Sequence, residues 1–148
     1  MTRHRRFAIV LGLLALAFAG RVLGQVVVAF DIGPANDWLP PMEAWYSRLV
    51  PYSVLLPAQV LILVLQAMHI GKLWRRPAVP ALSFAFGLKV FAVAYALAML
   101  LRYAVILLRN EGFGPEWWSG SVIPVTFHQV LAAYLFIWAK TRESGDRG

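Results

Sequence analysis

Cysteine is absent from the 148-residue chain, which excludes disulfides, thiolate metal ligands and thiol catalysis. Charge is also scarce, because only 14% of the residues are charged, with seven acidic residues against fourteen lysines and arginines. No HExxH, GxSxG or glycine-rich phosphate motif occurs, and no metal site is predicted. The residues identify no cofactor, so a non-enzymatic role is favoured while an enzymatic one stays open.

Apolar residues dominate instead. They make up 60% of the chain, whereas soluble domains hold about 45–50%. They fall into four runs near the length of about 20 residues that a transmembrane helix needs. The runs cover 7–30, 51–70, 81–108 and 121–139. The sequence therefore predicts an all-α membrane protein, a four-transmembrane-helix bundle in a single membrane domain spanning 1–148.

The first run, 7–30, is apolar except for Arg21 and Gln25. Gly20 and Gly24 stand four residues apart, a spacing that allows another helix to approach closely. The Ala-Phe-Ala sequence at 17–19 resembles a signal-peptidase site, but the apolar run is longer than the about 7–15 residues of a signal peptide. An uncleaved first helix is predicted, with removal of residues 1–19 as the alternative.

Basic residues predict the orientation. Four spans place the amino terminus, the 71–77 turn and the carboxyl-terminal tail on one side, with the cations Arg3, Arg5, Arg6, Lys72, Arg75, Arg76, Lys140, Arg142 and Arg147. The other side has only Arg48 and Arg109. The positive-inside rule then puts both termini in the cytoplasm. Arginine-rich composition is typical of some bacteria, so a bacterial inner membrane is expected. Because this charge lies at membrane edges, nucleic acid is not an expected partner.

Polar side chains inside the spans are the candidate site. By helical rise, four lie within about 5 Å of the midplane and two about 10 Å outward. The first four are Arg21, Gln59, His128 and Gln129, and the other two are Gln25 and Arg102. A central arginine is costly in a membrane unless it is paired. We therefore predict that Arg21 points into the bundle near His128 or Gln59. It would either bond to amides and a free carbonyl there or meet an anionic group from elsewhere.

Two histidines lie within the spans, His69 near one boundary and His128 near the midplane. Their levels differ by roughly 15 Å along the membrane normal, which argues against a bis-histidine haem. Three tyrosines either pack within the bundle or border a flat ring such as a quinone. They are Tyr95, Tyr103 and Tyr134.

The four short spans and the outer loop with Pro34, Trp38 and Trp45 resemble small bacterial inner-membrane proteins of unassigned function. In outline the chain is also similar to the DoxX-like and EXPERA four-helix groups. EXPERA proteins use intramembrane acids, whereas this chain has only Asp31, at the end of its first span. No functional residue is carried over from that resemblance.

Two classes of function remain. The first is a binding or accessory protein of the lipid bilayer, whose polar midplane site takes a lipid-like or anionic small ligand or a partner subunit. Docking on a larger membrane complex would use the Gly20/Gly24 surface, and a homo-oligomer stays open as an alternative. The alternative is a small membrane enzyme or redox carrier in which His128 and Arg21 surround a quinone or a single-histidine haem. A transporter is a weaker third option, since 148 residues give few helices.

Overall fold

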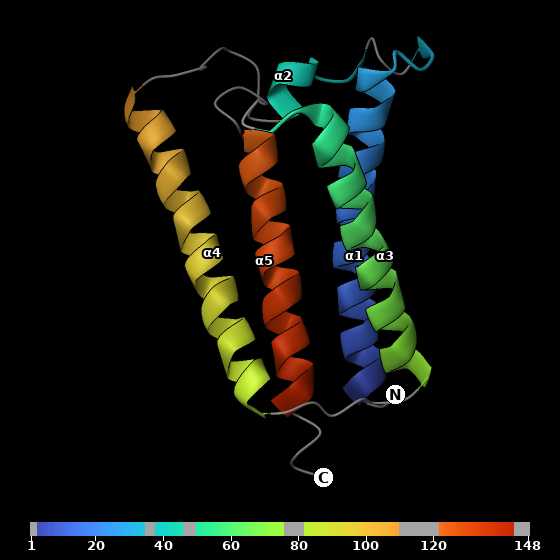
Figure 1. Cartoon of the computed structure of the whole chain (residues 1–148), viewed down its shortest axis with the longest axis vertical. Helices are drawn as coiled ribbons and strands as arrows, with labels where there is room; N and C mark the ends of the chain where they lie inside the picture. The colour runs from blue at the N-terminus through green and yellow to red at the C-terminus, as the bar shows by residue number, and fades with distance from the viewer. Residues whose placement is uncertain (1–2, 35–37, 46–49, 76–81, 110–121, 144–148) are drawn as a thin grey trace.

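The computed structural model describes residues 3–34, 38–45, 50–75, 82–109 and 122–143, and all regular structure within them is helical. The helices are α1 (Arg3–Ala29), α2 (Met42–Trp45), α3 (Tyr52–Arg75), α4 (Leu82–Arg109) and α5 (Val122–Glu143) (Figure 1). All but α2 are long and apolar enough to cross a membrane. The prediction of a helical protein with four apolar spans is confirmed, and each long helix begins and ends within five residues of its predicted run.

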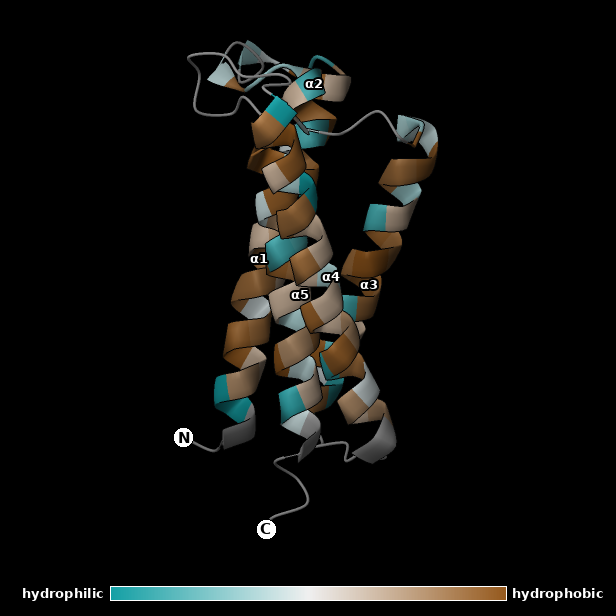
Figure 2. Ribbon diagram, turned by 90° about the vertical axis from the view of Figure 1, so that its left-hand side faces the viewer, coloured by the Kyte–Doolittle hydropathy of each residue, from teal (hydrophilic) through white to brown (hydrophobic). Residues whose placement is uncertain are grey.

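The long helices expose apolar side chains along their outer faces. Leu16, Phe86 and Leu101 are 68%, 70% and 67% exposed, which would be costly in water but favourable against lipid. Hydrophobic residues cover the helices along most of their length (Figure 2). The exposed surface therefore matches a protein surrounded by a bilayer.

Local geometry explains where α1 ends. Asp31 has a positive φ of 51°, and the Ile32 amide donates to the Val27 carbonyl at 3.0 Å. This pattern is a Schellman-type cap, in which a left-handed residue turns the chain away from the helix axis. Aspartate tolerates that conformation better than most residues, so the chain leaves the first span at this point.

The long helices do not form a closed ring. Helix α1 packs against α3 and α5, and α4 packs against α5 alone. Within the described residues, the backbones of α3 and α4 do not approach each other, and Figure 1 shows them on opposite sides of α5. The start of α1 and the end of α5 lie at one end of the molecule, and α2 lies at the other.

A small apolar core closes the bundle at the end that carries the start of α1. Its buried members come from three helices: Ala8 and Leu11 from α1, Leu73 from α3 and Tyr134 from α5. Leu11 is completely inaccessible to solvent. Toward α2 the interior also holds buried polar side chains, namely Arg21, Gln25 and Gln59.

Candidate ligand-binding cavity

A cavity of about 320 Å³ lies where α3 and α4 fail to meet. Side chains from all four long helices line it. The polar members are Arg21, Gln59, Tyr95, Arg102 and His128, and apolar walls include Phe18, Ile62, Met99, Phe127 and Leu131. No Asp or Glu is found among the described residues that line it. The cavity therefore combines a positively charged polar part with apolar walls.

The polar side chains of the cavity do not share one level. Tyr95 and His128 are hydrogen-bonded to each other, and the Ala96 carbonyl accepts from Gln129, so these residues of α4 and α5 face each other. Arg102 follows Ala96 by six residues and, at about 1.5 Å per residue, lies roughly 9 Å further toward the end of the molecule that carries α2. Arg102 is therefore nearer that end of the cavity than His128 is.

Arg21 points into the bundle, where it is only 8% exposed. Its Nη1 donates to Gln25 Oε1 at 3.3 Å, and its Nη2 donates to the Trp45 carbonyl at 2.8 Å. The guanidinium also lies 5.5 Å from the centre of the Phe127 ring, within cation–π range. Its direct partners are therefore Gln25 and the backbone carbonyl of Trp45, the last residue of α2. It reaches Gln59 only through Gln25.

Gln25 connects this network to α3. It is completely buried, its Nε2 donates to the Trp45 carbonyl at 3.2 Å, and its Oε1 accepts from Gln59 Nε2 at 2.9 Å. Two buried atoms in the network have no hydrogen-bond partner among the described residues, Arg21 Nε and Gln59 Oε1. Buried polar atoms are seldom left unsatisfied, so one donor and one acceptor beside the cavity are unusual in having no partner among the described residues.

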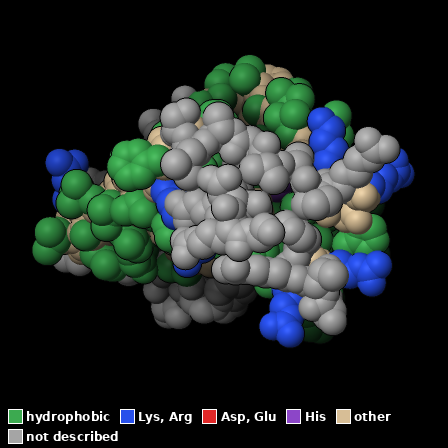
Figure 3. All heavy atoms as spheres, turned by 90° about the horizontal axis from the view of Figure 1, so that it is seen from below, with side chains coloured by type: hydrophobic (Ala, Val, Ile, Leu, Met, Phe, Trp, Pro, Cys, Tyr) green, Lys and Arg blue, Asp and Glu red, His purple; other side chains and the backbone are tan. Residues whose placement is uncertain are grey.

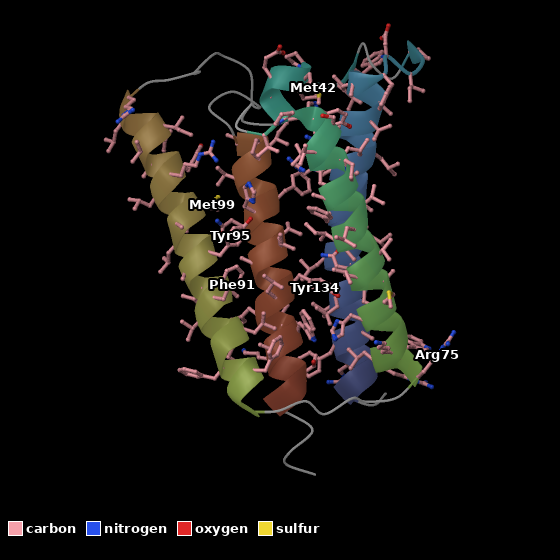
Figure 4. All side chains as sticks on the ribbon, viewed as in Figure 1. Met42, Arg75, Phe91, Tyr95, Met99 and Tyr134 are labelled. Atoms are coloured by element: carbon pink, nitrogen blue, oxygen red, sulfur yellow. The ribbon has the colours of Figure 1, made fainter. Side chains whose placement is uncertain are left out.

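A second polar pair comes from α4 and α5. The hydroxyl of Tyr95 and Nδ1 of His128 are hydrogen-bonded, and the two rings meet edge to face. In Figure 4, Tyr95 and Met99 lie on the side of α4 that is turned toward α5. If the hydroxyl donates to Nδ1, the neutral imidazole keeps its Nε2–H, and if Nδ1–H donates, the hydroxyl keeps its own hydrogen. In either tautomer this pair retains one spare donor.

Gln129 does not belong to the cavity. Its Nε2 donates to the Ala96 carbonyl at 3.1 Å and so joins α5 to α4. Although its estimated depth equals that of His128, the next position on a helix is rotated by about 100°. Depth alone did not distinguish these neighbours.

The glycine pair of α1, Gly20 and Gly24, has two different surroundings within the described chain. A Cβ at Gly20 would meet nothing within 4 Å. A Cβ at Gly24 would lie 2.9 Å from Cζ3 of Trp45 and would overlap the indole ring. Within the described chain Gly24 makes room for a tryptophan of α2, and Gly20 is open, so the packing of another helix against this pair stays a prediction.

His69, the other histidine within the apolar spans, lies in a separate cluster of side chains from α3 and α5. His69 Nδ1 is 3.1 Å from the Tyr134 hydroxyl, which donates to the Gln66 carbonyl at 3.3 Å. The His69 and Trp138 rings are 4.5 Å apart. His69 and His128 are thus each hydrogen-bonded to a different tyrosine.

Sequence reasoning did not find the carbonyl of Trp45, which accepts from both Arg21 and Gln25. No sequence signal marks the backbone carbonyl at the end of a short helix as the acceptor for a particular side chain. Phe127 was also missed, although it precedes His128 and its ring faces the guanidinium. Tyr95 was named only as a packing or ring-bordering residue.

No family model, curated protein or solved structure matches the chain. The resemblance to DoxX-like and EXPERA proteins therefore remains one of outline, namely four apolar helices.

Proposed function

We propose that this membrane protein binds a lipid-like molecule with an anionic head in the cavity between α3 and α4. The observation that carries the proposal is the cavity's charge: Arg21 and Arg102 line it together, with no carboxylate among its described residues. The unpartnered Arg21 Nε adds a buried donor. A phosphate or carboxylate would supply both the missing countercharge and the missing acceptor.

Electrostatics favours an anion here more strongly than at a protein surface. Removing a cation from water is expensive, and placing two near each other in a low-dielectric site adds repulsion. A bound anion offsets both costs. A guanidinium also suits oxyanions because its fork of N–H groups matches two oxygens at once.

The apolar walls and the open ring favour a ligand with a hydrocarbon part. At about 320 Å³ the cavity suits a head group and a short part of a chain. Since the backbones of α3 and α4 do not meet, the rest of the molecule can stay in the bilayer. We place the protein in a bacterial inner membrane with both termini in the cytoplasm, which puts the cavity in the outer half of the membrane.

A quinone is the second candidate, and the Tyr95–His128 pair favours it. The spare donor of this pair suits a quinone carbonyl, and the aromatic walls suit its flat ring. A quinone carries no charge that requires two arginines, which ranks it below the anionic ligand.

Lipid binding to the purified full-length protein tests the choice. In native mass spectrometry, oleate or phosphatidic acid should bind, whereas uncharged diacylglycerol should not. Replacing Arg21 or Arg102 with Leu should weaken binding about 10–100-fold, because each removes charged hydrogen bonds of about 1.5–3 kcal/mol.

Lys89→Leu is the matched control, since Lys89 is also a cation within α4 but does not line the cavity. It should leave binding unchanged. Equal losses in all three variants, or equal binding of charged and uncharged lipids, would contradict the proposal. Co-purification of a quinone, seen by its absorption spectrum, would favour the second candidate.

A further inference from the structure

A larger groove, of about 720 Å³, lies between α1 and α3 in the half of the molecule away from α2. Small residues from both helices line it: Gly12, Ala15, Ala19, Ala67 and Gly71. Leu16 and Trp74 also line the groove and are 68% and 55% exposed, so it faces the surroundings of the protein. From these features we infer that it holds one acyl chain of an anionic phospholipid, whose head group lies at Trp74 and Arg75.

The chain's own packing does not require the glycines of this groove. A Cβ at Gly12 or at Gly71 would meet nothing within 4 Å, in contrast to Gly24 of the same α1 helix. The missing side chains therefore leave space that no described residue fills. In a bilayer, such apolar space is filled by lipid.

The length of the groove matches one leaflet. Along α3 it extends from Leu63 to Arg75, which at about 1.5 Å per residue is roughly 18 Å. Half of a hydrocarbon core of about 30 Å is about 15 Å. An acyl chain lying in the groove would thus reach from the membrane surface to the middle of the bilayer.

The end of the groove at Trp74 and Arg75 carries the features of a head-group site. Arg75 lines it at the last residue of α3, and the Arg5 guanidinium lies 5.9 Å from the centre of the Trp74 ring. Figure 4 shows Arg75 at this end of α3, and in Figure 3 the charged side chains visible there among the described residues are Lys and Arg. Tryptophan favours the membrane interface, and cations near the membrane surface attract anionic lipid.

Charge also argues against a second copy of the chain as the occupant. Two copies in one membrane share their orientation, so a twofold interface through this groove would bring both Arg75 side chains to the same level. Like charges at such an interface repel each other. An anionic lipid has the complementary charge.

The test uses the full-length Arg21→Leu variant as the starting protein. Because this substitution weakens lipid binding in the cavity between α3 and α4, the lipid that remains bound reports on the groove, and each proposal can fail without the other. In native mass spectrometry with equal amounts of phosphatidylglycerol and phosphatidylcholine, this protein should retain phosphatidylglycerol preferentially. Adding Gly71→Leu or Gly12→Leu should fill the groove and reduce retention at least fivefold. Gly87→Leu is the control, because a Cβ there also meets nothing within 4 Å and Gly87 lies outside the groove.

Arg75→Gln tests the head-group site at an exposed residue whose replacement spares the core. It should reduce the preference for phosphatidylglycerol over phosphatidylcholine by at least threefold. The inference is overturned if both leucine variants retain lipid like the background protein, or if Arg75→Gln keeps the full preference. A dimer that dissociates on Gly71→Leu would assign the groove to a second copy and would also overturn it.

Discussion

At the scale of single residues, Gln25 holds the polar network beside the cavity together. It takes part in three hydrogen bonds, with Arg21, Gln59 and the Trp45 carbonyl. Two of these bonds reach other helices, α2 and α3, and hydrogen bonds between helices in membranes average about 0.6 kcal/mol each. Gln25→Leu should therefore destabilise the protein by about 1 kcal/mol. Gln129→Leu removes one such bond and should cost about half as much. Thermal unfolding in mild detergent compares the two, and equal melting temperatures would show that the network contributes little.

The inward orientation of Arg21 could be expected from its sequence position, because a central cation without a nearby acid must find a partner or reach the surface. The hydrogen-bond partners of Arg21 could not be predicted from the sequence. Gln25 lies one helical turn away, but only the structure shows that it also reaches α3 and the carbonyl of Trp45. Gln129 shows the limit of depth as a criterion, since its level agrees with the cavity while its side chain bonds to α4.

At the scale of elements, the packing of the Trp45 ring against Gly24 fixes the short helix α2 to α1. The indole is 7% exposed, and its Nε1 donates to the Pro40 carbonyl at 2.8 Å, so the ring has little freedom to move. Gly24→Ala should therefore displace α2. Overpacking of this kind costs about 1–3 kcal/mol, which should speed hydrogen exchange in 38–45 roughly tenfold.

Gly20→Ala, one turn away on α1, is the matched control because the space at Gly20 is open. It should leave exchange in 38–45 unchanged. Equal hydrogen exchange in the two variants would show that the packing of Trp45 against Gly24 does not hold α2 in place.

The sequence predicts the long helices well and their packing poorly. Continuous apolar runs fix the length of a helix in a bilayer, because every backbone polar group must be paired within it. The same runs are apolar on all sides, so they do not indicate which helix lies next to which. The separation of α3 from α4, which creates the cavity, therefore appears only in the structure.

At the scale of the whole molecule, the packing of α1 bears on whether its first half is retained. Ala8 and Leu11 are 2% and 0% exposed and pack in one cluster with Leu73 and Tyr134. Removal of residues 1–19 would open this core and also delete the α1 side of the groove. This supports the hypothesis of an uncleaved first helix, and the amino-terminal sequence of the mature protein tests it. A chain that begins at Gly20 would contradict it.

The distribution of basic residues and the even number of predicted spans together support an orientation with both termini in the cytoplasm. The start of α1 and the end of α5 lie at one end of the molecule (Figure 1), and that end carries most of the cations outside the membrane. Reporters fused after Arg76 and Arg147 should therefore read cytoplasmic, and reporters within 31–50 and 109–120 should read external. An external carboxyl terminus would contradict the orientation. It would also move the α1–α3 groove to the outer leaflet and the arginine-lined cavity to the inner one, where anionic lipids are more abundant.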